Sequence, residues 1–298
     1  MAMDKPPRDA ALRTGSDLLY RVVAAESDDI NLSMPHIHGD LYRASSTAGQ
    51  VVITVRAYEQ LHLMTMEFGY QLLGRAAPDD GSVVLGLILE AAPGARWDGR
   101  DLAAGDVVLY PPGAGHSAID AQGLRIGVIT IDRDRLAGCV EDLGRRPVDL
   151  ERGPLRADLA RKVIDAFELI PTHDDPSAVI STVAAVLSSP PITRREPRRI
   201  ASSEVITARA IDYAHASGDW SPSSITLCRE IGVSERRLQL AFAELYGMSP
   251  TAYMRQQALS IARSRLLQAN ESVPAPVTSV AYGLGFKHLG RFAKEYRQ

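Results

Sequence analysis

Cysteine is scarce in this chain of 298 residues, with only Cys139 and Cys228. Neither belongs to a Cys-x-x-Cys pair or to a Cys/His cluster. A disulfide framework needs paired cysteines, and a structural zinc site needs thiols and imidazoles at close spacing. The sequence therefore predicts neither a disulfide framework nor a structural zinc site. It favours a metal-free protein in a reducing cytoplasm.

Long apolar runs are missing as well. The first residues, MAMDKPPRDAALRTG, contain no apolar core of signal-peptide length. No run reaches the roughly 20 apolar residues that a membrane span needs. We expect a soluble cytoplasmic protein with no membrane partner, long enough for about two domains with their own cores.

The sequence patterns of common enzymes are also absent. There is no Gly-rich phosphate loop, no Ser/His/Asp set and no pair of carboxylates that stands out as catalytic. The expectation is a protein that is not an enzyme and that has no cofactor.

Positive charge is concentrated in the last third of the chain. Of the 33 Lys/Arg and 36 Asp/Glu residues, residues 193–298 hold 15 and 9, which leaves 18 and 27 for residues 1–192. Such an asymmetry favours a polyanionic partner for the C-terminal part. The alternative is an ordinary solvated surface.

Two kinds of periodicity predict two domains. Residues 1–29 are polar and are expected to be a loose segment. Residues 30–150 hold short Val-, Ile- and Leu-rich runs between Gly, Pro and Asp turn clusters, which is typical of an all-β barrel. The clearest runs are QVVITVRAY (50–58), SVVLGLILEA (82–91), GDVVLYPP (105–112) and LRIGVITID (124–132).

From about residue 155 the pattern becomes helical. Residues 151–187 are predicted to be a helical connector. Residues 188–203, rich in Pro, Ser and Arg, are predicted to be a linker. The rest of the chain, 204–298, is expected to be all-α.

The stretch LCREIGVSERRLQLAFAELYG (227–247) is either one helix damaged by Gly232 or two helices that need a tight turn there. In the second interpretation Gly232 supplies a positive φ and Ser234 is the N-cap of the second helix. The apolar residues then form one inner face: Leu227, Cys228, Ile231, Leu238, Phe242 and Leu245.

The same arrangement returns 53 residues later in VTSVAYGLGFKHLGRFAKEY (277–296), where Gly285 matches Gly232 and the second turn is one residue longer. A long helical segment, 249–269, joins the two. A single pattern of this kind could be an αα-hairpin, but a repeat in register predicts two helix-turn-helix units, at about 225–246 and 277–298. The matching inner residues are Val280, Ala281, Leu284, Phe292 and Tyr296.

A helix-turn-helix unit lays its second helix in the major groove of DNA. Arg and Lys pair with guanine, Gln pairs with adenine, and an aliphatic side chain can touch a thymine methyl group. The alternatives are ordinary exposed residues, or non-specific packaging of nucleic acid. The outward residues are Arg236, Arg237, Gln239 and Leu240 in the first unit, and Lys287, His288, Gly290, Arg291 and Lys294 in the second.

The joint pattern SERRLQLAFAELYGMSPTAYMRQQALSIARSRLL and VTSVAYGLGFKHLGRFAKEYR resembles the DNA-binding domain of the AraC/XylS family of bacterial transcription regulators, over about residues 204–298. GFKHLGRFAKEYR is most similar to the branch that includes the ethanolamine-operon activator. The resemblance implies two helix-turn-helix units that read successive major-groove segments of an operator. It places base contacts at Arg236, Gln239, Leu240, Gly290, Arg291 and Lys294.

The sequence departs from that family in two ways. Leu240 and Gly290 stand where polar side chains are common. Members of this branch also usually continue past the equivalent of Arg297, whereas this sequence stops at Gln298. We expect the second unit to be C-terminally truncated, frayed and the weaker reader.

The stretch GDVVLYPPGAGHSAID (105–120) resembles the second motif of the cupin superfamily, with Asp120 where asparagine is usual. In metal-binding cupins the equivalent of His116 acts with an earlier His-x-His and Glu, but residues 83–99 contain no histidine, and His36 and His38 come too early. We expect His116 to be a locally bonded turn residue. The alternative is a metal-dependent cupin enzyme with a nucleic-acid-binding tail.

By resemblance, regulators of this architecture bind a small-molecule effector in the N-terminal domain, dimerise through it, or both. Candidate residues of an effector pocket are Trp97, Tyr110 and His116, although a core or rim position is the favoured interpretation of each. The methionines of 58–73 are expected in the core. Partners are double-stranded DNA, the effector, RNA polymerase and a second copy of the chain. The signal is expected to cross the helices of 155–187 and 204–217, or the linker.

Overall fold

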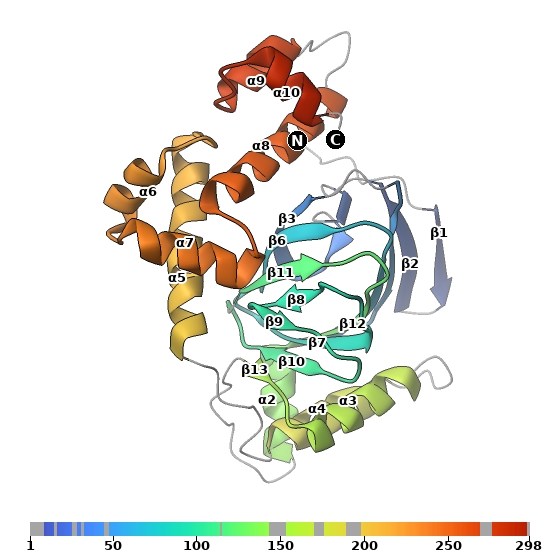
Figure 1. Cartoon of the computed structure of the whole chain (residues 1–298). Helices are drawn as coiled ribbons and strands as arrows, with labels where there is room; N and C mark the ends of the chain where they lie inside the picture. Colours follow the sequence, from blue (N-terminus) through green and yellow to red (C-terminus); the bar gives the residue numbers. More distant parts are fainter. Residues whose placement is uncertain are drawn as a thin grey trace.

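The computed structural model describes most of the chain and divides it into a β-rich N-terminal domain and an all-helical C-terminal domain (Figure 1). This division matches the predicted fold class. The described residues are 9–14, 17–25, 29–30, 33–44, 48–113, 115–142, 153–169, 176–188, 198–268 and 276–296.

Two antiparallel sheets form the N-terminal domain and pack around a common core, as in a double-sheet barrel. The larger sheet has the order β1 (Asp9–Thr14), β2 (Asp17–Ala24), β4 (Val51–Ala57), β5 (Leu61–Phe68), β12 (Arg125–Asp132), β7 (Ser82–Glu90), β10 (Val107–Tyr110), β13 (Gly153–Pro154). The smaller sheet has the order β3 (Ile37–Arg43), β6 (Leu72–Pro78), β11 (His116–Asp120), β8 (Arg96–Trp97), β9 (Arg100–Asp101).

The four clearest β runs of the sequence are strands β4, β7, β10 and β12, as predicted. The N-terminal segment differs from the expectation. Residues 9–14 and 17–24 are strands, and β2 pairs with β4 in continuous register from Leu18 against Ala57 to Ala24 against Val51. The expected loose segment 1–29 is therefore wrong for these residues, because the edge of β4 offers backbone partners that a sequence pattern does not reveal.

Strand β7 shows how the barrel packs on both faces. Val84 and Ile88 belong to the core between the two sheets, whereas Leu85 and Leu87 belong to a second core on the outer face of the larger sheet. Burial on both faces explains why β7 reads as an unbroken apolar run rather than an alternation.

Three helices cover the outer face of the larger sheet: α2 (Arg133–Asp142), α3 (Ala157–Leu169) and α4 (Ser177–Leu187). Helix α2 was not predicted. The segment 151–187 was expected to connect sensor and reader, but β13 pairs with β10, and α3 and α4 pack against the barrel on the side away from the C-terminal helices (Figure 1). Within the described part, this segment belongs to the barrel.

The C-terminal domain begins earlier than expected, because α5 starts at Arg198 and takes up the last residues of the predicted linker 188–203. Ser188 is the C-cap of α4, and residues 189–197 lie outside the described part. The helices are α5 (Arg198–Ser217), α6 (Ser224–Ile231), α7 (Glu235–Tyr246), α8 (Pro250–Gln268), α9 (Val277–Gly283) and α10 (Leu289–Tyr296).

The core of the helical domain extends onto the barrel. Tyr42, Leu73 and Ile119, from the outer face of the smaller sheet, belong to the same cluster of buried residues as the inner faces of α5 to α10. The Tyr42 ring meets the edge of the Tyr253 ring at a centroid distance of 5.5 Å. The two domains are thus packed directly against each other.

None of the helices in the described ranges is both long enough and apolar enough to cross a membrane.

Candidate nucleic-acid interface and barrel cavity

Helices α6 and α7 form the first helix-turn-helix unit, with the ends that the sequence predicts. Gly232 ends α6 in the left-handed region, with φ of 69°. The Ser234 hydroxyl accepts a hydrogen bond from the Arg237 amide and caps the start of α7. Gly232 is therefore a turn between two helices.

The inner face of this unit is buried as predicted: Leu227, Ile231, Leu238, Phe242 and Leu245 are at most 2% exposed. Cys228 is only partly buried. Because this face packs against α5 and the barrel, the opposite face of α7 is left to solvent.

The predicted contact residues of the first unit lie together on α7. Arg236, Arg237 and Leu240 are exposed and Gln239 is half-buried. Leu240 is 56% exposed, so its aliphatic side chain is open to contact from outside the protein. Arg237 donates a hydrogen bond to the Ser202 hydroxyl at 3.0 Å, whereas Arg236 forms no ion pair or side-chain hydrogen bond with any described residue.

Helices α9 and α10 form the second unit. Gly285 has φ of 84°, as its match to Gly232 predicts, but it lies one residue beyond the C-cap of α9. Val280, Ala281, Leu284 and Phe292 are buried, and Tyr296 is half-buried at the end of α10. The repeat seen in the sequence is thus a structural repeat.

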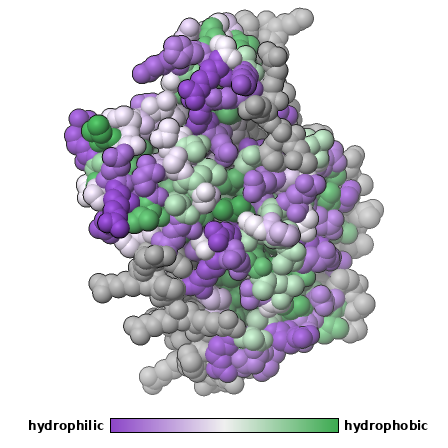
Figure 2. Space-filling model, in the orientation of Figure 1, coloured by the Kyte–Doolittle hydropathy of each residue, from purple (hydrophilic) through white to green (hydrophobic). Residues whose placement is uncertain are grey.

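The predicted contact residues of the second unit share one exposed face. Lys287 and His288 precede α10, and Gly290, Arg291 and Lys294 lie on it; all five are exposed. Figure 2 shows hydrophilic side chains gathered over these helices and over the first unit.

One of these residues is already engaged within the protein. Arg291 Nε donates to Glu295 Oε1 at 2.9 Å, and Arg255 of α8 pairs with the other oxygen of the same carboxylate. Partial burial opposes ionisation of Glu295, but the hydrogen bonds from the two arginines outweigh it and lower its pKa. Glu295 therefore holds α10 to α8 and holds Arg291 at the same time.

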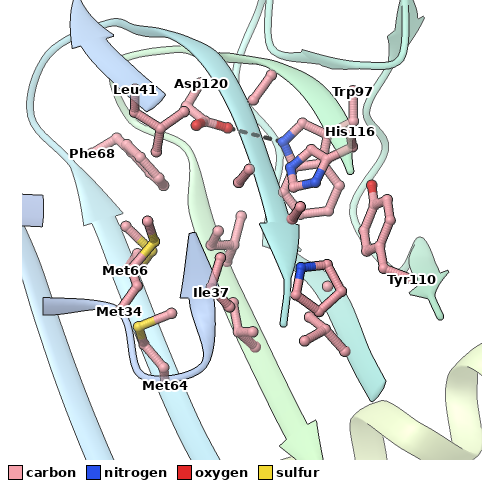
Figure 3. Close-up of a pocket in the computed structure, with 18 residues that line it drawn as sticks. Met34, Ile37, Leu41, Met64, Met66, Phe68, Trp97, Tyr110, His116 and Asp120 are labelled. Carbon is pink, nitrogen blue, oxygen red and sulfur yellow. Dashed lines mark hydrogen bonds between the residues drawn. The ribbon is translucent and has the colours of Figure 1, made fainter. Parts of the chain in front are cut away.

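A cavity of about 50 Å³ lies between the two sheets of the barrel (Figure 3). Its walls are mostly apolar, and the polar side chains gather at one side. The lining residues come from both sheets. They include three methionines and four side chains with a polar atom: Met34, Met64, Met66, Trp97, Tyr110, His116 and Asp120.

The three candidate pocket residues of the sequence are brought together here. The His116 ring stacks on Tyr110 at a centroid distance of 4.5 Å and lies 5.2 Å from the Trp97 ring. Trp97 fits because Gly86 of β7 has no side chain: a Cβ there would lie 2.5 Å from the indole. His116 was expected to be a locally bonded turn residue, but it begins strand β11 and lines the cavity.

Asp120 is the cavity residue that the sequence analysis missed. Trp97 Nε1 donates to Asp120 Oδ1 at 2.9 Å, and the carboxyl is 3% exposed. Burial raises the pKa of Asp120 to about 7, although the indole hydrogen bond works in the opposite direction. The sequence did contain one sign that Asp120 is special, because this aspartate stands where the cupin-like motif usually has asparagine.

Met64 and Met66 were predicted to be core residues. They are buried, and they also line the cavity on the side opposite the polar groups (Figure 3). Within the described ranges, no three His, Cys, Asp or Glu side chains come together as ligands for a metal ion.

Strand β11 touches both the cavity and the helical domain. His116, Ala118 and Asp120 line the cavity, whereas Ile119, between them, belongs to the buried cluster of the helical domain. This follows from the alternation of side chains along a strand. The same strand thus has a cavity face and a face toward α7.

The turn between β8 and β9 makes a second link. It follows Trp97 and carries Gly99, where a Cβ would lie 2.7 Å from the carbonyl oxygen of Glu244 in α7. Arg75 of β6 also pairs with Asp212 of α5 at 3.5 Å. The barrel therefore meets the C-terminal end of α7, and the exposed contact residues lie at its N-terminal end.

Comparison with known proteins agrees with the description of the C-terminal domain. Residues 227–298 match the family described as "Helix-turn-helix domain". The chain is 36% identical over 93 residues to the "Probable thc operon regulatory protein" of Rhodococcus erythropolis, which is 31% of this chain and 28% of that protein. It is 40% identical over 65 residues to the "XylDLEGF operon transcriptional activator 1" of Pseudomonas putida, 22% of this chain and 19% of that protein.

The chain thus spans less than a third of the length of these curated relatives. Among solved structures, the AraC-like transcriptional activator CuxR has a TM-score of 0.38 and 16% identity, covering 87% of this chain and 98% of that chain. A predicted oxalate decarboxylase of Thermotoga maritima has a TM-score of 0.23 and 18% identity, covering 32% and 93%.

Proposed function

We propose that this protein is a sequence-specific DNA-binding transcription regulator of the AraC/XylS type. The observation that carries the proposal is the repeat of two helix-turn-helix units whose inner faces are buried and whose second helices, α7 and α10, expose the predicted contact residues. A buried repeat of this kind has no structural need for basic residues on both outer faces, whereas a DNA reader does.

The chemistry of each residue suggests its part. Arg236 and Gln239 have side chains that pair with guanine and adenine edges, and the exposed Leu240 suits a thymine methyl group. Arg291 and Lys294 would act in the second groove segment, and Gly290 would let the backbone approach closely. Arg237, Lys287 and His288 would contact bases or phosphates.

The first test is fluorescence anisotropy with the duplex upstream of the protein's own gene and with random duplex, across a salt series. We expect a preference of about 10³-fold or more for the cognate duplex. Arg236→Ala should remove most of it. The matched control is Arg161→Ala, which removes the same charge from the exposed face of α3, at the other end of the molecule (Figure 1). Binding that is steep in salt but indifferent to sequence would contradict the proposal.

The barrel is the proposed sensor. A molecule in the cavity would touch Trp97 and Asp120, whose chain neighbours Gly99 and Ile119 pack against the helical domain. The signal would then pass directly through β11 and the β8–β9 turn to α7, rather than through α3 and α4. A homodimer and a contact with RNA polymerase are further parts of the proposal, as is the branch that includes the ethanolamine-operon activator.

This direct route can be tested with a matched pair of glycine substitutions. Gly99→Ala would push a Cβ against Glu244, whereas Gly105→Ala imposes a similar positive-φ strain with no atom within 4 Å. We expect Gly99→Ala to change DNA affinity and the domain arrangement in small-angle scattering, and Gly105→Ala to change neither. Equal behaviour of the two variants would contradict a signal through this contact.

A further inference from the structure

The chemistry of the barrel cavity narrows the class of molecule that it can hold, provided that the barrel is the sensor of the proposed regulator. Its 18 lining residues include no lysine or arginine. A carboxylate in this space would meet neither a lysine nor an arginine and would lie near the Asp120 carboxyl. Burial of an unpaired charge is costly, so an anionic molecule is disfavoured.

A cation fits poorly for a related reason. The apolar walls already penalise the charge of Asp120, as its raised pKa of about 7 indicates. An ammonium group would lose its hydration on entering these apolar walls, and among the lining residues the Asp120 carboxyl is the single acidic group that could balance its charge. The titratable lining groups are Asp120 and His116 of β11 and Tyr110 of β10, and Trp97 of β8 faces them as a neutral donor.

The shape and the surfaces favour a small ring. Trp97, Tyr110 and His116 offer ring faces on one side, and Met34, Met64 and Met66 lie opposite (Figure 3). A cavity of about 50 Å³ holds more than one water-sized group, whereas a cavity that binds benzene measures about 150 Å³, so a ring enters only if the walls move apart. Methionine is unbranched and adapts its shape, so these side chains can widen the space for one ring.

We infer that the cavity binds a compact neutral organic molecule, with a single-ring apolar body between the aromatic and methionine walls and one hydroxyl group at Asp120. The carboxyl serves this hydroxyl in either form, because the carboxylate accepts a hydrogen bond and the protonated acid donates one. A neutral ligand should therefore bind with little dependence on pH near neutrality.

The test uses four molecules of nearly the same shape on the full chain: benzyl alcohol, benzylammonium, benzoate and toluene. Calorimetry and thermal shift at pH 6, 7 and 8 give their affinities. Benzyl alcohol should bind about tenfold more tightly than toluene through its hydroxyl, and more tightly than either ion. Its affinity should change less than about threefold across this pH range, whereas binding as an ion pair with Asp120 would change about tenfold.

Three variants locate the binding. Gly86→Ala would place a Cβ 2.5 Å from the Trp97 indole, so this wall of the cavity must shift, and it should weaken the binding of all four molecules. Asp120→Val should remove the advantage of the alcohol over toluene. Asp120→Asn keeps an acceptor for Trp97 Nε1 and should retain the alcohol preference with no pH dependence, so it serves if the valine variant does not fold. Glu90→Gln, an exposed carboxylate on β7, is the control that should change nothing.

Three outcomes would each overturn the inference. The first is tighter binding of benzylammonium or benzoate than of benzyl alcohol, and the second is a benzyl alcohol affinity no higher than that of toluene. The third is that the unaltered protein binds these molecules no more tightly than the Gly86→Ala variant does. DNA preference is measured separately without ligand. If DNA preference is present and alcohol binding is absent, the inference fails and the proposed function stands. If alcohol binding is present and DNA preference is absent, the proposed function fails instead.

Discussion

The two helix-turn-helix units share a sequence pattern but differ in how their helices end. In the first unit, α6 and α7 both begin at a serine whose side chain accepts an amide hydrogen bond, and both end at a glycine in the left-handed region. In the second unit, the N-cap residue of α9 is Pro276, which offers no side-chain cap, and its C-cap residue is Leu284 rather than a glycine. Each missing cap leaves terminal backbone groups to water.

The units also differ in what they pack against. Rings of Phe242, Tyr246 and Tyr253 connect the first unit to Tyr42 of the barrel. In the second unit, the Phe292 side chain is the buried anchor of α10, and Arg255 holds that unit through Glu295 and the Phe286 ring. Both units belong to one buried cluster, but the first packs directly on α5 and the barrel, whereas the second is joined to that cluster through α8.

The largest expected effect comes from removing one anchor of each unit. Phe242→Ala and Phe292→Ala should each cost about 3–5 kcal/mol of local packing. Phe242→Ala should lower the global stability of the helical domain, whereas Phe292→Ala should release only α9 and α10. Amide exchange of 225–246 and 277–296 measures this, and in the unaltered protein the second range should exchange faster. Equal protection of the two ranges would contradict the expected lower stability of the second unit.

The two turn glycines offer a second contrast. Both have positive φ, but a Cβ at Gly232 meets nothing within 4 Å, whereas one at Gly285 would lie 2.8 Å from Ser221 Cβ. Gly232→Ala should cost about 1–2 kcal/mol of backbone strain. Gly285→Ala should cost roughly 2–4 kcal/mol because a clash is added. Denaturant unfolding measures both, and a larger cost at Gly232 would refute the clash argument.

A helix cap can be removed from the first unit and added to the second. Ser234→Ala removes the cap of α7 and should cost about 1 kcal/mol, and Pro276→Ser should stabilise α9 by somewhat less, since it adds a missing acceptor. Helix content and amide exchange at 277–280 measure the gain. Thr226→Ala leaves the Ser223 cap acceptor in place and is the control with a small expected effect.

The smallest effect concerns Glu295. Its pKa lies below the ordinary value of 4.5, so the ion pairs stabilise the docked α10 above about pH 4.5, and this contribution is lost as the pH falls through the lowered pKa. Glu295→Gln should make the docking of α10 insensitive to acid and should release Arg291, which would raise DNA affinity about threefold by removing a negative charge from the interface. Exchange at pH 4 and pH 7 and anisotropy test this; unchanged affinity would mean that Glu295 does not restrain Arg291.

Much of this architecture could be predicted from local patterns. Gly232, Ser234 and the buried face from Leu227 to Leu245 follow from helical period and turn chemistry, which involve neighbours within a few residues. The N-terminal strands β1 and β2 and helix α2 were not predicted: β2 is ordered by pairing with β4, about 30 residues further along the chain, and β1 is added to β2 at the edge of that sheet. Trp97, Tyr110 and His116 were named as a group, but Asp120 was passed over because a lone aspartate reveals neither its burial nor its partner.

The sequence by itself determined the two domains, the repeated helix-turn-helix units and the outward position of the basic residues, because these depend on periodicity and on the backbone preferences of single residues. Only the tertiary structure decided that α3 and α4 cover the barrel, that β11 lies between the cavity and α7, and that Glu295 holds two arginines. The reason is physical: contacts between strands and helices far apart in the chain arise from packing and from the burial of polar groups in a common core. Contacts of this kind leave no periodic pattern in the sequence from which they could be predicted.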